Sequence, residues 1–149
     1  LADGPAAKIA GDDDAEPPPG DWHYITARDV GPRGGKVRIW ERGRGGEYLQ
    51  VELRIPRRAL EDEETIVMAV KGWDLSELVI GFGPAGLDFK RDAKLTIRLG
   101  KGQVDIDLDT LEAFHDGDPM PVRVRGTRRV EIQIKVPGFS RYSLGGGNA

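Results

Sequence analysis

Cysteine is absent from this chain of 149 residues. Its absence excludes disulfide bridges, thiolate nucleophiles and cysteine-ligated metals. Histidine occurs only at His23 and His115, and two histidines without a carboxylate pattern around them do not predict a metal site. The sequence also lacks a phosphate-binding Gly-Lys-Ser/Thr loop and a nucleotide-binding glycine fingerprint. No cofactor is therefore predicted.

Long hydrophobic runs are also missing. No stretch approaches the roughly 18 apolar residues that a membrane-spanning helix needs, so we predict no direct membrane insertion. The chain starts at Leu1 rather than Met and shows no leader peptide, and we expect it to have been cut or processed from a longer protein. Hydrophobic residues make up 38% and charged residues 32% of the chain, which suits one core under a charged surface.

Negative charge is concentrated at the beginning of the chain. Residues 1–20 combine five carboxylates, at Asp3, Asp12, Asp13, Asp14 and Glu16, with one Lys and three consecutive prolines. Such a segment buries too little apolar surface to offset its ordering entropy. We predict a disordered acidic, proline-rich linker over 1–20 and one folded domain over 21–149. The domain is close to neutral as a whole, so no nucleic-acid partner is predicted.

Alternating apolar and polar residues recur along the domain. Period-two alternation predicts strands with one buried face, and Gly and Pro, 21 and 10 in number, separate the segments. The predicted strands include 36–40, 48–55, 65–70, 94–99, 104–108, 121–125 and 130–136. Counting the weaker segments, we predict an all-β fold: an antiparallel β-sandwich of about nine or ten short strands with no long helix.

The last predicted strand organises the rest of the fold. Val130, Ile132, Ile134 and Val136 alternate with polar residues. We expect the strand to stop at Pro137, which cannot donate to a ladder. Phe139 and Tyr142 are expected to seal one end of the sandwich.

The order of several short motifs resembles the ZU-five domain, found in zona occludens proteins, netrin receptors of the uncoordinated-five type and ankyrins. The motifs are Gly34-Gly35, Ile55-Pro56-x-x-Ala59-Leu60, Gly83-Pro84-x-Gly86-Leu87-x-Phe89, Leu95-Thr96-Ile97 and Phe139-Ser140-Arg141-Tyr142. The resemblance runs from about Gly34 to Gly145 and implies an antiparallel sandwich used for protein–protein contact.

Some ZU-five domains cut their own chain within a His-Phe-Ser motif. Phe139 and Ser140 match the last two positions, but Gly138 stands where the resemblance requires the histidine. A serine hydroxyl that attacks the preceding carbonyl needs a nearby base, and glycine cannot accept the proton. We therefore predict that the domain is not an enzyme, and keep self-cleavage at Phe139–Ser140 as an alternative.

Three further groups of residues are binding candidates. Asp105, Asp107 and Asp109 share one face of a predicted strand and form a weak candidate for a cation, against the simpler interpretation of a solvated face. The basic residues of the last hairpin suit an acidic partner or an anionic polymer, or serve only to protect a strand edge; they are Arg123, Arg125, Arg128 and Arg129. A second basic stretch covers residues 33–44.

Tryptophan is the third candidate, because pyranose rings stack on indole. Trp73, beside Gly72 and Asp74, is the best exposed candidate, with Trp22 as a second choice, against the simpler interpretation that both pack in the core or at its rim; Trp40 is predicted to lie in the core.

These patterns favour a non-enzymatic protein-interaction or spacer module of a larger secreted or cell-envelope protein, extracellular or periplasmic. Its partner would be another protein or a neighbouring domain of the same chain. A self-cleaving domain and a carbohydrate-binding module are the alternatives.

Overall fold

The computed structural model describes residues 21–84, 86–105, 112–115, 118–120, 122–126, 129–139 and 141–145, with no side chains given for 112–115, 118–120 and 141–145. Within these residues the regular structure consists of β-strands and two short 3₁₀ turns, η2 (Leu75–Glu77) and η3 (Lys101–Gln103). The described part of the chain contains no helix long and apolar enough to cross a membrane. The predicted all-β class is confirmed.

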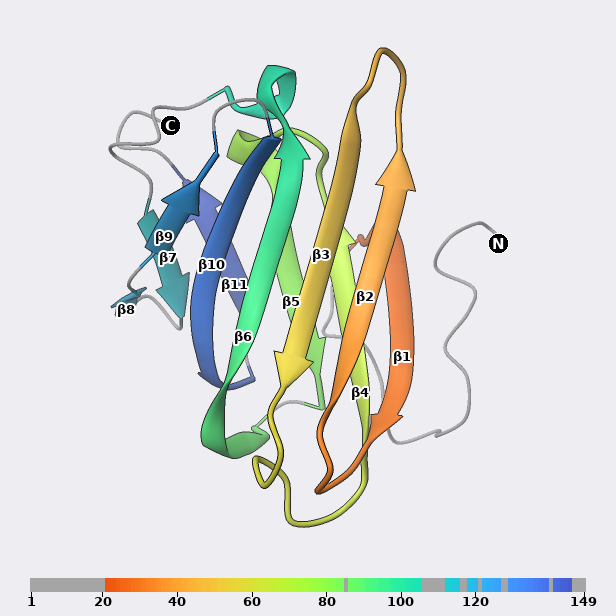
Figure 1. Ribbon diagram of the computed structural model, residues 1–149, viewed down its shortest axis with the longest axis vertical. Coiled ribbons are helices and arrows are strands. Elements are labelled where there is room, and N and C mark those ends of the chain that lie inside the picture. The colour runs from red at the N-terminus through yellow and green to blue at the C-terminus, as the bar shows by residue number, and fades with distance from the viewer. Residues whose placement is uncertain are drawn as a thin grey trace.

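The strands form two antiparallel sheets that face each other (Figure 1). The first sheet has the order β1 (Tyr24–Val30), β4 (Glu64–Lys71), β5 (Val79–Gly83), β11 (Arg141–Gly145), β7 (Glu112–His115) and β8 (Asp118–Met120). The second has the order β2 (Gly35–Arg42), β3 (Tyr48–Ile55), β6 (Asp88–Gly100), β10 (Arg129–Gly138) and β9 (Val122–Arg125). Side chains are described for three strands of the first sheet and all five of the second.

Period-two alternation positions the second sheet over the core. On β3, Leu49, Val51, Leu53 and Ile55 are buried, while the residues between them lie on the outer face. The same alternation holds on β10, where Val130, Ile132, Ile134 and Val136 are buried as predicted. The outward side chains of these two strands can therefore be placed by counting from a buried neighbour.

The order of the strands in the second sheet differs from their order in the sequence. β3 pairs with β6 rather than with β4, its successor in sequence, and β6 pairs with β10 on its other side. β10 then forms a hairpin with β9 around Gly126, whose φ of +91° is a conformation that glycine adopts without steric cost. The predicted hairpin of 121–125 with 129–136 is confirmed.

Two predicted strand boundaries are wrong. β10 does not stop at Pro137 but continues to Gly138, because its register with β6 shifts between Val136 and Gly138. A register irregularity is a place where proline is tolerated within a strand, since no ladder bond is lost. The predicted strand 104–108 is also wrong at its start, because residues 104 and 105 are not part of a strand. Val104 follows η3 as irregular chain, its amide donating to the Lys101 carbonyl at 3.1 Å.

Candidate functional site

The outer face of the second sheet carries an unusual arrangement of charge. The registers place Lys36 opposite Arg54, Arg54 opposite Lys94, and Lys94 opposite Lys135. These four cationic side chains, here called the basic row, cross β2, β3, β6 and β10, and all are exposed. Cross-strand neighbours of like charge repel each other and destabilise a sheet. A row of three such neighbouring pairs costs stability, and its presence needs another explanation.

Neighbouring positions on the same face carry charges of both signs, but none of them forms an ion pair with the basic row among the described residues. Arg38 and Arg123 lie one row further along, at the two edges of the sheet. Among the described residues the ion pairs are Lys90 with Glu61 and Arg98 with Glu131, neither of which involves the basic row. The carboxylates near the row are Glu52 on β3 and Asp92 on β6.

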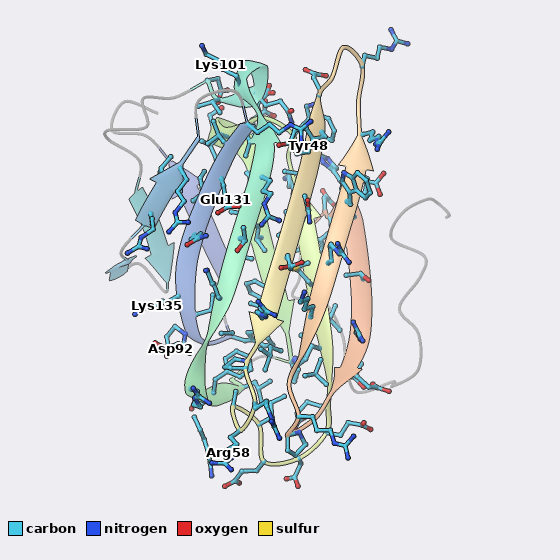
Figure 2. The ribbon with its side chains drawn as sticks, in the orientation of Figure 1. Tyr48, Arg58, Asp92, Lys101, Glu131 and Lys135 are labelled. Atoms are coloured by element: carbon cyan, nitrogen blue, oxygen red, sulfur yellow. The ribbon has the colours of Figure 1, made fainter. Side chains whose placement is uncertain are left out.

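The middle of the face has a polar network instead. Arg98 Nε donates to Glu131 Oε1 at 2.7 Å, and Gln133 Nε2 donates to Glu131 Oε2 at 2.7 Å. The hydrogen bond from Arg98 lowers the pKa of Glu131, with burial opposing the shift and Gln133 adding to it. This carboxylate is therefore already satisfied and does not compensate the basic row. Figure 2 shows Glu131 between Tyr48 at one end of the sheet and Lys135 towards the other.

A surface groove of about 930 Å³ lies at the end of the face opposite to the basic row. It is bounded by the β2–β3 hairpin, the end of β6, η3 and the start of β10. Trp40, Arg42, Tyr48 and Arg129 line it. Its other polar side chains are those of Glu47, Gln50, Arg98, Lys101, Gln103 and Glu131. The Arg42 guanidinium lies 4.9 Å from the Trp40 ring centre, and that of Arg129 lies 5.9 Å from the ring of Tyr48.

Gln103 fixes the wall of this groove, which we call the aromatic groove. Its side chain is fully buried, and its Oε1 accepts hydrogen bonds from the amides of Tyr48 at 3.0 Å and Gly100 at 3.1 Å. Its Nε2 donates to the Trp73 carbonyl at 3.3 Å. One buried amide thus holds together the start of β3, the end of β6 and the loop that contains Trp73.

The structure places residues of the two basic stretches on one sheet face, at its opposite edges. Arg123 and Arg125 are exposed on β9, Arg129 is exposed on β10, and Arg128 lies outside the described residues. They share the outer face with Lys36 and Arg38 because β2 and β9 are the two edges of the same sheet. The sequence interpretation missed Arg54, Lys94 and Lys135. Alternation identifies each as outward-facing, but only the strand order aligns them in a row.

The predictions for tryptophan need correction. Trp40 is 54% exposed, not part of the core, because Val37 and Ile39 occupy the inward positions of β2 and force Trp40 outward. Trp73, the best exposed candidate from the sequence, is half-buried and packs against the core, as the simpler interpretation has it. Trp22 is half-buried as well. Trp40 is therefore the tryptophan that offers a ring to solvent.

The aspartate prediction finds no support among the described residues. Asp105 accepts hydrogen bonds from the Ser76 amide at 2.9 Å and from the Ser76 hydroxyl at 2.5 Å. Burial raises the pKa of Asp105, but these hydrogen bonds outweigh it and the pKa lies below its usual value. Asp107 and Asp109 lie outside the described residues. No group of three or more His, Asp or Glu side chains that could hold a metal ion occurs in the described part.

The position of the motif histidine is sterically closed. A Cβ atom on Gly138 would lie 2.8 Å from the Leu87 carbonyl oxygen and 2.8 Å from Asp88 Oδ1. Phe139, next in the chain, is buried, and its amide donates to the same Leu87 carbonyl at 2.8 Å. Ser140 and the side chain of Tyr142 lie outside the described residues. This position therefore accommodates glycine but leaves no space for the side chain of a histidine.

Comparisons with known proteins found no matching family model, no matching curated protein and no matching solved structure. The resemblance to the ZU-five domain stays a prediction from the sequence motifs.

Proposed function

We propose that this domain is a non-enzymatic interaction module and that the basic row is where it binds an acidic segment of a partner protein. The observation that carries the proposal is the alignment of Lys36, Arg54, Lys94 and Lys135 across four adjacent strands, with no ion-pair partner among the described residues. An arrangement that destabilises the free domain is favourable when an anionic partner neutralises it.

The dimensions of the basic row fit an extended peptide. Adjacent strands lie about 4.8 Å apart, so the row spans on the order of 15 Å from Lys36 to Lys135. An extended chain advances about 3.3 Å per residue, and a segment of about five residues rich in Asp and Glu covers this distance. Long Lys and Arg side chains adjust to carboxylates on such a segment. The resemblance to ZU-five domains, which serve protein–protein contact, supports the same role.

Poly-L-glutamate is a suitable probe because it offers carboxylates without aromatic groups or sugar rings. We expect the full chain to bind it at low salt, and binding to weaken as salt rises because the attraction is screened. Charge reversal at two positions of the row, Lys36→Glu with Lys94→Glu, is expected to raise the Kd at least about tenfold, equivalent to about 1.4 kcal/mol.

A matched control separates a specific surface from overall charge. Arg44 is exposed in the turn after β2, at the end of that strand far from Lys36, and Lys71 is exposed at the end of β4 in the first sheet. The double variant Arg44→Glu with Lys71→Glu has the same net charge as the test variant, and we expect its Kd to change less than about twofold. Equal losses in the two variants would contradict the proposal. Tighter binding of a single-stranded oligonucleotide than of poly-L-glutamate would do so too.

A further inference from the structure

The aromatic groove has features that the basic row lacks. Trp40 is the exposed large hydrophobic residue of the described chain, at 54% exposure, and the groove leaves its ring accessible beside the half-buried Tyr48. Exposed aromatic surface that also lines a concavity is typical of a ligand site rather than of a solvated sheet face. Figure 2 shows Tyr48 and Lys101 together at this end of the sheet.

Each aromatic ring of the groove has a cation beside it. Arg42 lies over Trp40 and Arg129 over Tyr48, so each guanidinium is held near a flat apolar surface by a cation–π contact. A guanidinium stacked in this way still presents its N–H groups at the edge, where they bind a carboxylate in a bidentate manner. Arg42 and Arg129 have no ion-pair partner among the described residues.

The walls of the groove leave room for a ligand. A Cβ atom on Gly45, Gly46 or Gly102 would meet nothing within 4 Å, so the space beside these lining residues is open. The volume of about 930 Å³ is at the upper end of the usual range for small-molecule sites. Gln50, opposite Trp40 in the register, adds an amide that can donate to and accept from hydroxyl groups.

We propose that the aromatic groove binds an acidic oligosaccharide, with a uronic acid ring stacked on Trp40 and its carboxylate held by Arg42 or Arg129. The apolar C–H face of a pyranose matches an indole ring, and the sugar hydroxyls match Gln50. The carboxylate matches a guanidinium that has no ion-pair partner within the described part of the chain. A neutral sugar uses the ring but leaves these guanidiniums without an anion. An acidic peptide uses the guanidiniums but leaves Trp40 uncovered.

This site is independent of the basic row proposed above. The groove and the row lie at opposite ends of the same face, and the row residues Lys36, Arg54, Lys94 and Lys135 do not line the groove. The carbohydrate-binding alternative thereby moves from Trp73 to Trp40.

Oligogalacturonate is the test ligand, and its methyl ester is the matched control because it has the same rings with masked carboxylates. Titration calorimetry on the full chain is expected to show binding of the acid and at least about tenfold weaker binding of the ester. Tryptophan fluorescence is expected to change on binding of the acid. Trp40→Ala and Arg42→Gln are each expected to weaken binding of the acid at least about tenfold.

Arg54→Gln is the matched control variant, since it removes one exposed cation from the same face outside the groove. We expect less than about a twofold change in oligogalacturonate binding for Arg54→Gln. A flat titration of the unaltered chain, equal binding of acid and ester, or unchanged binding by Trp40→Ala would each overturn the proposal. Trp40-dependent binding of single-stranded oligonucleotide in preference to oligogalacturonate would also overturn it.

The two proposals fail separately. Unchanged poly-L-glutamate binding by the Lys36 and Lys94 double variant would overturn only the proposal for the basic row. Unchanged oligogalacturonate binding by Trp40→Ala would overturn only the proposal for the groove. Circular dichroism and urea unfolding of Trp40→Ala check its fold, which we expect to persist because the ring lies outside the core.

Discussion

Phe139 stacks on Phe82 with ring centres 4.9 Å apart and ring planes 10° from parallel. Phe82 belongs to β5 of the first sheet, and Phe139 follows β10 of the second, so the contact connects the two sheets. Phe89 of β6 meets the same Phe139 ring edge-on, with centres 5.0 Å apart. The three rings close one end of the core, as the sequence predicted for Phe139.

Removing the central ring should therefore cost much stability. Phe139→Ala is expected to lower the free energy of unfolding by about 3–5 kcal/mol, because it deletes a buried ring and leaves a cavity between two others. Phe139→Leu keeps most of the apolar volume and is expected to cost clearly less, about 1–2 kcal/mol. Urea unfolding followed by circular dichroism measures both. Similar small losses for the two variants would contradict a closing role for this ring.

Restoring the histidine of the self-cleavage motif is expected to disrupt the structure rather than create a protease. Gly138→His places a Cβ against the Leu87 carbonyl, and forcing such a contact costs about 1–3 kcal/mol. Gly138→Ala, which introduces the same Cβ without a base, is expected to be destabilised comparably. Intact-mass measurement after long incubation at neutral pH should show an uncut chain for the natural sequence and for both variants. Fragments ending at Phe139 would contradict this.

Gln103 provides a third test, of the groove wall. Gln103→Leu removes the acceptor of two backbone amides, those of Tyr48 and Gly100. Unsatisfied buried donors are costly, so we expect a loss of at least about 2 kcal/mol in unfolding free energy. Lys101→Leu is the control on the same 3₁₀ turn, where an exposed side chain should matter by less than about 0.5 kcal/mol. Equal effects of the two changes would show that the Gln103 hydrogen bonds are not what holds the wall.

Much of this fold was predictable because its strands alternate cleanly. β3 and the buried residues of β10 follow from period two alone, and the same count applied to β2 would have placed Trp40 outside. Trp40 was assigned to the core because tryptophan is usually buried, and this general preference was given more weight than the period-two alternation of β2. The predicted strand 104–108 fails at its first two residues, where Asp105 binds Ser76 through a contact between segments far apart in sequence, and its other residues lie outside the described part.

The candidate site itself was beyond the sequence for a different reason. The basic row exists only because β3 pairs with β6, although β4 and β5 lie between them in the sequence and belong to the other sheet. No local pattern reports that crossover, and without it Arg54 and Lys94 are ordinary exposed residues. The aromatic groove likewise needs the start of β10 beside the β2–β3 hairpin.

The hydrogen bond from Arg98 gives the domain a pH dependence in acid. The pKa of Glu131 is lower in the folded state than in the unfolded chain, where it is about 4.3. Its stabilisation is thus complete above the unfolded pKa and disappears as the pH falls through the folded pKa. Glu131→Gln should lower the unfolding free energy at neutral pH by up to about 1 kcal/mol, a small value because Arg98 is partly exposed.

Urea unfolding of Glu131→Gln and of the natural sequence, measured from neutral pH down to about pH 3, should show the difference shrinking. Arg98→Gln removes the same hydrogen bond from the other side. The double variant is expected to lose little more than either single one, since the two residues share one interaction. A difference that stays constant with pH would show that Glu131 contributes by packing rather than by charge.

The basic row leads to a prediction in which stability and binding change in opposite directions. Lys94 stands between Arg54 and Lys135 and faces a like charge on either side. Lys94→Gln removes both repulsions, so we expect the free domain to gain about 0.2–1 kcal/mol at low salt. The same variant should bind poly-L-glutamate more weakly, because the centre of the row is lost. High salt should remove most of the gain, since screening weakens the repulsion in the natural sequence.

Lys71→Gln tests whether the gain at Lys94 is local. Lys71 is an exposed cation at the end of β4 in the first sheet, and its replacement changes the net charge equally without touching the basic row. We expect no stabilisation and unchanged poly-L-glutamate binding for Lys71→Gln. Urea unfolding at low and high salt, with titrations on the same samples, gives both quantities for each variant. Destabilisation of Lys94→Gln at low salt would mean that the cations of the row do not repel one another appreciably, and the argument that the row persists for binding would fail with it.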